Sequence, residues 1–254
     1  MSDIFDPVGD APRDPMRSAE RPRALPKRFY ERADFTEDGD GFVIRLDGKP
    51  VRTPAKSVLH VPSRAVAEAL VAEWTAQQTY IDPATMPLTR LVNSAIDGVA
   101  LAPEAVRAEI VRYAGTDLLC YRAADPERLV RRQDEIWSPL IDWMHERFGV
   151  RFLLAEGIVP VEQFPETLEA VDRALGDPDP LRLAALSTVN TLTGSAILTL
   201  ALLHGRITAA EAWQAAHVDE DFEIGLWGED SEATARREAR WQEMSAAALV
   251  LSSS

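Results

Sequence analysis

The stretch DGDGFVIRLDGKPVRTP, residues 38–54, alternates large apolar side chains with small or polar ones. Phe42, Ile44 and Leu46 would share one face of an extended chain. Asp-Gly pairs are typical of tight hairpin turns because glycine adopts positive φ freely. Three such pairs interrupt this region, at 38–39, 40–41 and 47–48. The pattern predicts a small β-meander over residues 29–61, which needs a second layer to cover its apolar face.

Beyond residue 62 the apolar period changes from two residues to the 3.6 residues of a helix. Helical stripes or boundary signals are found over residues 66–74, 88–99, 106–114, 129–148, 166–175, 180–204, 208–217 and 231–251. Pro139 is expected to kink or split its helix. Residues 150–161 are expected to form one or two short strands. Thr208 and Glu211 have the spacing of a capping box at a helix start.

These patterns predict an α+β fold with a small N-terminal β-rich domain and a larger, mostly α-helical C-terminal domain. Residues 1–26 hold five prolines, mixed charges and few large apolar groups, which predicts a disordered tail. The β-rich domain is placed at residues 27–62, with an extension to about residue 85 left open. The helical domain is placed at residues 63–254.

Residues 183–203 contain no charged side chain and are long enough to span a membrane. Eight Ser, Thr, Asn and Gly residues make the run too polar for a lipid-facing helix. It is therefore predicted to be a buried helix in the core, with no membrane insertion. Gly194 and Ser195 would let a neighbouring helix approach closely.

The overall charge limits the partners. The chain has 254 residues and a net charge of −14, which argues against binding nucleic acid or anionic lipid. The single cysteine, Cys120, excludes an internal disulfide and a zinc framework and favours a reducing compartment. The first residues resemble neither a secretory signal nor an organellar presequence. We expect a bacterial cytoplasmic protein, although a processed organellar protein stays open, and a monomer because no coiled-coil pattern is present.

No sequence motif indicates catalysis or a cofactor. Neither GxGxxG nor GxxxxGK[ST] is present, and residues 194–198, GSAIL, do not match a GxSxG elbow. The four histidines have no metal-binding spacing. His217 beside Asp219 and Asp221 is the best metal candidate, but the order of acids does not match a calcium loop. The sequence therefore predicts no catalytic residue, no metal site and no cofactor.

The run DEDFEIGLWGEDSE, residues 219–232, contains seven carboxylic acids and no base. It is a solvated turn between two helices, or a binding surface in which acids surround large apolar groups. Asp230 is a plausible N-cap and Glu232 would lie in the first turn of the last helix, so both are alternatively structural. Trp227 and Leu226 either face the core or anchor a partner. A hydrolase based on paired carboxylates is a further alternative.

Seven stretches in order along the chain resemble the ATP12 family, assembly chaperones of the F1 sector of ATP synthase. They are KRFYERADF (27–35), LDGKPVRTPAK (46–56), AEWTAQQTYIDPATMPLTRLVNSAIDGV (72–99), YAGTDLLCYRA (113–123), QDEIWSPLIDWM (133–144), TLTGSAILTLAL (191–202) and AWQAAHVDEDFEIGLWGEDSEATARR (212–237). The series is spread, in order, over nearly the whole range from residue 27 to 250. At residues 221–223, Asp-Phe-Glu replaces an aromatic residue and Gln that are frequent in the family, which adds acidity.

The resemblance implies the same β-then-helical architecture and a binding function without catalysis. It implies an ATP-independent chaperone that binds the free α subunit of F1-ATPase, masks its aggregation-prone interface and releases it to the β subunit. In organellar relatives it implies the mitochondrial matrix. We expect the client site to comprise Asp219, Glu220, Trp227, Glu229, Asp230 and Glu232.

Three alternatives stay open from the sequence alone. Residues 72–99 are either a second contact surface or a packing hinge stiffened by Pro83 and Pro87, with Arg90 and Asn93 bonded to the connector. An enzyme that uses the acidic cluster is the second alternative, and a buried carboxylate with a raised pKa in a pocket would favour it. The third is a scaffold for a different partner.

Overall fold

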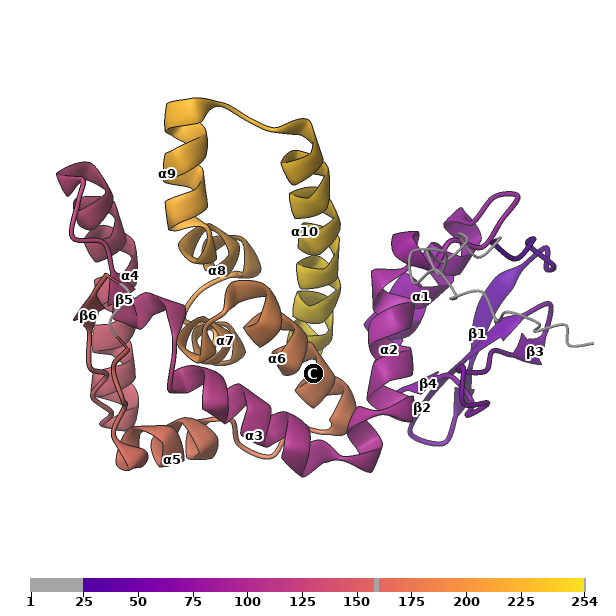
Figure 1. Ribbon diagram of the computed structural model, residues 1–254. Helices are drawn as coiled ribbons and strands as arrows, with labels where there is room; N and C mark the ends of the chain where they lie inside the picture. Colours follow the sequence, from indigo (N-terminus) through magenta and orange to yellow (C-terminus); the bar gives the residue numbers. More distant parts are fainter. Residues whose placement is uncertain (1–24, 158–159, 254) are drawn as a thin grey trace, which may run out of the picture.

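The computed structural model describes residues 25–157 and 160–253. It confirms the predicted α+β architecture, with a small sheet followed by a helical body (Figure 1). The predicted tail lies outside the described residues except for Leu25 and Pro26. Pro26 is already held in place, because its carbonyl accepts a hydrogen bond of 2.8 Å from the Ile81 amide.

Strand β2 (Gly41–Leu46) is the centre of the sheet. It pairs antiparallel with β1 (Ala33–Asp38), β3 (Lys49–Pro50) and β4 (His60–Val61). Positive φ at Gly39 and Gly48 confirms two of the expected Asp-Gly turns. The pair at 40–41 is not a turn, because Gly41 pairs with Asp38 as the first residue of β2. A Cβ on Gly41 would lie 2.4 Å from the His60 ring, so close packing requires the glycine there.

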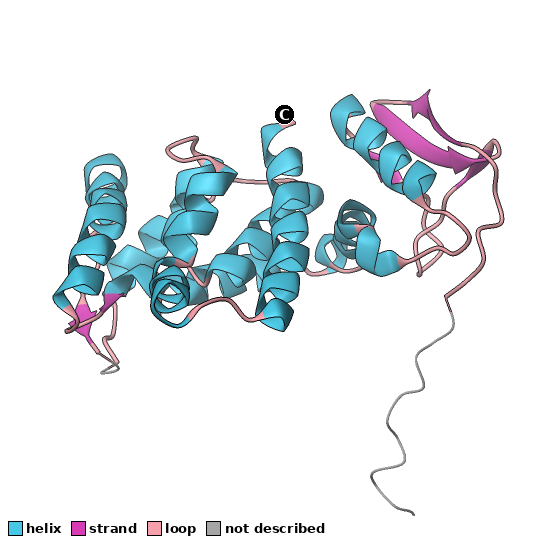
Figure 2. Ribbon diagram, turned by 90° about the horizontal axis from the view of Figure 1, so that it is seen from above, coloured by secondary structure: helices cyan, strands magenta, loops and turns pink. Residues whose placement is uncertain are grey.

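Helix α1 (Arg64–Ala76) supplies the second layer that the meander needs. It packs against β1 and β2, and Figure 2 shows it lying across the sheet. Its Arg64 guanidinium lies over the rings of Phe35 and Phe42, at 5.5 and 5.2 Å from the two centroids. The buried side chains Val66 and Leu70 of α1 belong to the same hydrophobic core as Ile44.

Hydrogen bonds join the two ends of the connector between α1 and the next helix. Glu73 of α1 accepts hydrogen bonds from the backbone N–H groups of Leu88 and Thr89, at 2.7 and 2.8 Å, and so caps α2 (Pro87–Asp97). Between them lies the single turn η2 (Pro83–Thr85), capped by Asp82. These bonds support the packing-hinge interpretation of residues 72–99. Arg90 does not bond the connector as expected but forms an ion pair of 2.8 Å with Glu243.

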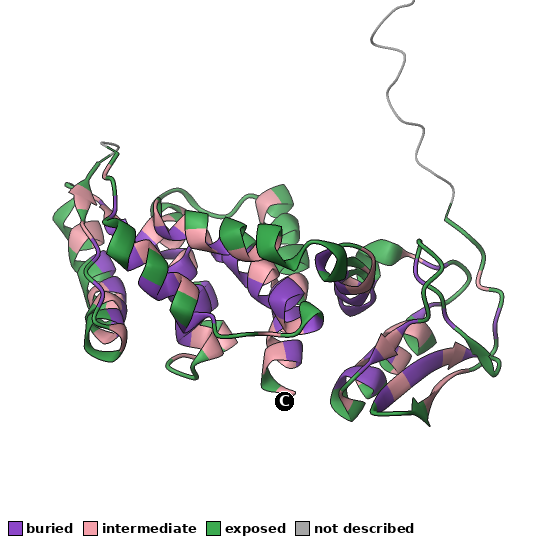
Figure 3. Ribbon diagram, turned by 90° about the horizontal axis from the view of Figure 1, so that it is seen from below, coloured by how far each residue is buried: buried purple, intermediate pink, exposed green. Residues whose placement is uncertain are grey.

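The remaining elements build the helical body. They are η3 (Val99–Leu101), α3 (Pro103–Ala114), η4 (Leu118–Cys120), β5 (Tyr121–Arg122), α4 (Glu127–Phe148), β6 (Ala155–Glu156), α5 (Pro165–Ala174), α6 (Pro180–Thr193), α7 (Ala196–Leu203), α8 (Ala209–Ala216), α9 (Val218–Trp227) and α10 (Ser231–Ser252). Helix α6 is central and packs against α2, α3, α7 and α10. Figure 3 shows the buried positions concentrated on the inward faces of the helices.

Three expectations about the helical body can be compared with these bounds. Helix α4 continues through Pro139, so the expected split is wrong. Of residues 150–161, Ala155–Glu156 form a short strand, which pairs in parallel with β5. The capping box of Thr208 and Glu211 is confirmed. Within the described ranges, no helix is long and apolar enough to cross a membrane.

The uncharged run at 183–203 is buried as predicted, but it is two helices and not one. Gly194 ends α6 with a left-handed φ of 67°. Ser195 then caps α7 by accepting a hydrogen bond of 3.0 Å from the Leu198 amide. A Cβ on Gly194 would meet only Leu118, at an ordinary 4.0 Å. The glycine is therefore needed for its backbone conformation and not for the close helix approach that we expected.

Candidate functional site

Most of the acidic run is helical, so its interpretation as a solvated turn between two helices holds only for residues 228–230. Residues 218–227 make up α9, and Asp219, Glu220 and Asp221 lie in its first turn. Carboxylates are stabilised there because the exposed N–H groups of a helix start carry partial positive charge. Gly228, with φ of 89°, ends the helix, and Asp230 begins α10. We call residues 218–237 the acidic hairpin.

The acidic hairpin projects from the helical body. In Figure 1, α9 and α10 rise side by side and are joined at the top of the view by residues 228–230. Arg237 of α10 pairs with Asp221 of α9 at 2.6 Å and ties the two helices together. Both partners of this ion pair are about three-quarters buried. Sequence reasoning did not select Arg237, because the pairing depends on how α10 folds back along α9.

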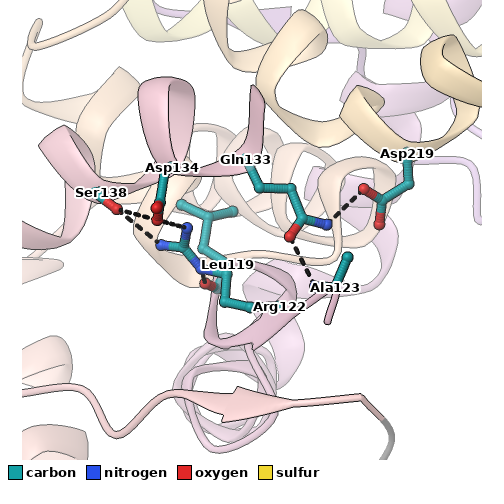
Figure 4. A network of polar contacts seen from close by, with 7 residues as sticks. All are labelled: Leu119, Arg122, Ala123, Gln133, Asp134, Ser138 and Asp219. Atoms are coloured by element: carbon teal, nitrogen blue, oxygen red, sulfur yellow. Dashed lines mark hydrogen bonds and ion pairs between the residues drawn. The ribbon is translucent and has the colours of Figure 1, made fainter. Parts of the chain in front are cut away.

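Asp219 faces α4 and not the tip of the hairpin. Its Oδ1 accepts a hydrogen bond of 2.7 Å from Nε2 of Gln133, a buried residue of α4 (Figure 4). Oε1 of the same Gln133 accepts one of 2.8 Å from the Ala123 amide. Asp219 therefore anchors the base of α9 to α4 of the helical body. As a client contact it would have to lie at the tip of the hairpin.

A second set of polar contacts lies beside this anchor on α4. Arg122 is 9% exposed, donates to the Leu119 carbonyl at 2.9 Å and pairs with Asp134 at 3.2 Å (Figure 4). Its guanidinium also lies over the Trp137 ring, 5.3 Å from the centroid. Burial lowers the pKa of Arg122, while Asp134 raises it. These contacts hold β5 against α4, so that the Ala123 amide meets Gln133.

Trp227 stands at the tip of the acidic hairpin with 86% of its surface exposed. Leu226 beside it is 54% exposed, so neither residue faces the core. Trp227 lines a pocket between α9 and α10 that encloses about 410 Å³. The pocket lining is Glu220, Glu223, Ile224, Trp227, Gly228, Glu229, Asp230, Ala233, Thr234 and Arg237. The structure thus brings four of the six candidate residues to one place.

The carboxylates around this pocket differ in how they are paired. Asp230 caps α10 by accepting a hydrogen bond of 2.8 Å from the Ala233 amide, as predicted. Glu220 lies 3.8 Å from His217. Glu223 and Glu229 have no ion pair among the described residues. Sequence reasoning missed Glu223, although its place in the acidic run was the available signal.

Glu232 lies outside the pocket. It is in the first turn of α10 and forms an exposed ion pair of 3.4 Å with Arg236. Asp230 and Glu232 therefore do have the structural placements that the capping alternative predicted. For Asp230 the two interpretations are compatible, since it both caps the helix and lines the pocket.

The arrangement does not favour metal or acid–base chemistry. His217 is buried, its Nδ1 lies 2.7 Å from the Trp213 carbonyl, and burial lowers its pKa. Among the described residues, no group of three or more His, Cys, Asp or Glu side chains could hold a metal ion. Asp117 has a pKa raised by burial to about 6, but it is 0% exposed and caps α7. An acid without access to solvent cannot reach a substrate.

Comparisons with known proteins agree with this architecture. Residues 27–145 match the family described as ATP12 chaperone protein. The mitochondrial protein atp12 of Schizosaccharomyces pombe is 23% identical over 223 residues, covering 83% of this chain and 77% of its own.

Two solved structures are more similar. A putative chaperone from Agrobacterium tumefaciens is 50% identical, with a TM-score of 0.85 over 90% of this chain and 86% of its own. Atp12 from Paracoccus denitrificans is 41% identical, with a TM-score of 0.81 over 89% of this chain and 97% of its own. With identity at this level over nearly the whole length, the chain belongs to the ATP12 chaperone family.

Proposed function

We propose that this protein is an ATP-independent assembly chaperone that binds the free α subunit of F1-ATP synthase. It masks the aggregation-prone interface of that subunit and releases it to the β subunit. The observation that carries the proposal is Trp227, an 86% exposed indole at the tip of the acidic hairpin, surrounded by carboxylates. Large exposed aromatic groups with a charged rim are characteristic of protein-binding sites.

The geometry supports reversible binding. A free subunit exposes apolar surface that belongs against its neighbours, and such surface aggregates. Trp227 and Leu226 offer apolar contact, while Glu220, Glu223 and Glu229 attract basic groups around it. Attraction between opposite charges speeds association more than it strengthens binding. A larger native interface can therefore displace this contact without ATP.

The client site that we propose is narrower than the one expected from sequence. It comprises Glu220, Glu223, Trp227, Glu229 and Asp230 at the pocket, with Asp219 as an anchor and Glu232 at the edge. We propose no catalytic role and no cofactor. A bacterial cytoplasm is the compartment we propose, as opposed to the mitochondrial one in the name of the fission yeast relative.

An aggregation assay tests the proposal. The F1 α subunit is diluted from denaturant with and without this protein, in the absence of nucleotide, beside an unrelated aggregating client. The protein should suppress aggregation of the α subunit selectively. Equal suppression of both clients would reduce the function to a general holdase, and suppression of neither would refute it.

Charge reversal locates the site in the same assay. The double substitution Glu223→Lys and Glu229→Lys should abolish protection and leave the melting temperature nearly unchanged, because both side chains are exposed and lack ion pairs among the described residues. The matched control is Glu146→Lys with Glu162→Lys, two exposed acids outside the hairpin with the same change in net charge. If both double variants lose protection equally, overall charge and not the hairpin is responsible.

A further inference from the structure

An aromatic pocket lies on the sheet end of the molecule, apart from the acidic hairpin. It encloses about 540 Å³ between residues 29–30, the turn after β2, and Trp74 of α1. Three rings form its apolar part. The Tyr30 centroid lies 5.4 Å from that of Phe29 and 5.7 Å from that of Trp74, each in an edge-to-face arrangement. We call it the N-terminal aromatic pocket.

One ring of this pocket is left uncovered. Phe29 is 74% exposed, whereas Tyr30 is 5% exposed and donates a hydrogen bond of 2.7 Å to the Trp74 carbonyl. Exposing an aromatic ring to water is unfavourable, and such rings anchor partners at protein interfaces. Tyr30 and Trp74 provide a rigid base, so a partner at Phe29 would meet a surface that needs little reordering.

One buried donor beside the pocket lacks a partner. The indole N–H of Trp74 is shielded from solvent and has no hydrogen-bond partner among the described residues. A buried N–H without a partner is costly to stability. Because this N–H is closed to solvent, a ligand in the pocket does not reach it, and the case for a partner rests on Phe29 and on the charges beside it.

The charge around the pocket is opposite in sign to that of the chain. Lys49 and Arg52 line it and are exposed. All three lysines of the protein, at positions 27, 49 and 56, lie in this region, although the chain carries a net charge of −14. The lining acid, Asp47, is occupied by hydrogen bonds from the backbone N–H groups of Glu31 and Arg32. Arg52 donates a hydrogen bond of 2.8 Å to the Lys56 carbonyl, but neither Lys49 nor Arg52 has an ion pair among the described residues, so both charges are available to an acidic partner.

We propose that the N-terminal aromatic pocket binds a short acidic segment of a partner protein, with a large apolar side chain against Phe29. Carboxylates of the segment pair with Lys49 and Arg52. The observations favour a protein segment over a small acid, because Phe29 stands at the rim and its cover has to extend beyond the pocket. This inference goes beyond the proposed function and uses a different surface from the acidic hairpin.

Anisotropy with a synthetic probe tests this inference. The probe is a short fluorescein-labelled peptide that alternates Asp with Phe and Leu, titrated with the full chain. Binding should saturate and should weaken as salt is added. Phe29→Ala should weaken it roughly tenfold or more, as for an interface anchor. Lys49→Glu with Arg52→Glu should abolish it. Because all three side chains are exposed, the melting temperature should not change.

Matched controls decide what the result means. Leu101→Ala removes an equally exposed apolar side chain elsewhere and should leave binding unchanged. Trp227→Ala should keep peptide affinity while it loses protection of the α subunit, so failure of this inference and failure of the proposed function are distinguishable. A second peptide with Lys in place of Asp should not bind. Equal affinity for both peptides, or equal loss in Leu101→Ala, would overturn the proposal.

Sedimentation velocity of the protein alone tests the other occupant, a second copy of the chain, whose acidic hairpin has suitable charge. The proposal predicts the same sedimentation coefficient for the unaltered chain and Phe29→Ala. A dimer that Phe29→Ala dissociates would overturn it, since the pocket would then be a self-association surface.

Discussion

Single carboxylates in this chain take their roles from the donors around them. Asp117 receives hydrogen bonds from the Leu119 and Ile197 amides and from the Ser195 hydroxyl, at 2.7–3.0 Å, and is wholly buried. Asp219 receives one from buried Gln133, and Glu223 and Glu229 remain unpaired among the described residues. The sequence shows which of these acids belong to an acidic run. It does not show how many hydrogen bonds each carboxylate accepts, because the donors come from distant segments.

Asp117 should make stability depend on pH in an unusual direction. Burial raises its pKa from 3.8 to about 6, so the folded state holds the proton more tightly than the unfolded state. Its contribution to the free energy of unfolding is therefore least favourable above pH 6 and improves as pH falls toward 4. The full difference is about 3 kcal/mol, by order of magnitude.

Denaturant titration of Asp117→Asn measures this effect against the unaltered chain. Asn keeps the size but presents an NH₂ group to backbone donors, so the variant should be less stable at pH 7, by about 1–3 kcal/mol. Only the unaltered chain is stabilised by protonation of Asp117. The difference in free energy of unfolding between the two proteins should therefore increase from pH 6.5 to pH 4.5. A gap that narrows on acidification would contradict the assignment.

Asp219 gives the second prediction, because an anchor and a client contact respond differently to loss of charge. Asp219→Asn keeps an oxygen that can accept from Gln133 and should retain both stability and protection of the α subunit. Asp219→Ala leaves the buried Gln133 amide unpaired and should lower stability by about 1–2 kcal/mol. Urea titration and the aggregation assay measure the two quantities, and loss of protection in Asp219→Asn would make its charge a direct contact.

At the scale of elements, period and turn chemistry predicted the meander, the order of helices and the burial of residues 183–203. Short sequence patterns did not predict where some helices and strands begin and end. A helix over 218–227 was not predicted, because its acids and Gly225 suit a turn equally well. The pairing of β5 with β6 was missed, since each strand is two residues long and the partners are more than thirty residues apart. The site tip at Trp227 was predicted, but the pocket wall from α10 was not.

The break between α6 and α7 provides a prediction about glycine. Gly194→Ala places a Cβ in a left-handed conformation with φ of 67° and should cost about 1–2 kcal/mol. Gly225→Ala is the matched control, because this residue lies within α9 and a Cβ there meets nothing within 4 Å. It should stabilise the helix by about 0.5–1 kcal/mol.

Thermal unfolding followed by circular dichroism compares the two glycine variants under one condition. Opposite signs are expected, with Gly194→Ala below the unaltered chain and Gly225→Ala at or above it. If Gly194→Ala has the same melting temperature as the unaltered chain, the left-handed conformation at residue 194 is not needed to separate α6 from α7. The expectation of a single helix over residues 180–204 would then be supported.

At the scale of the whole molecule, charge is unevenly distributed: residues 218–237 hold seven Asp or Glu and two Arg, whereas residues 27–62 hold six Asp or Glu and seven Lys or Arg. The acidic hairpin rises from the helical body (Figure 1). The three lysines, at positions 27, 49 and 56, belong to the segment that builds the sheet. We propose that the boundary between the two parts falls in the connector of residues 77–86, because α1 packs on the sheet. This is the longer of the two extents that the sequence left open for the β-rich domain. The composition gives the net charge, but only the fold shows on which surfaces the charged side chains lie.

Hydrogen–deuterium exchange of this protein, with and without the F1 α subunit, tests the central claim most directly. The amides of residues 220–237 should become protected on binding, and Trp227→Ala should remove that protection together with the binding. The core helix α6 should exchange equally in both states, which serves as the internal control. Binding of the α subunit with no added protection in the acidic hairpin would contradict the account, because the client would then occupy another surface.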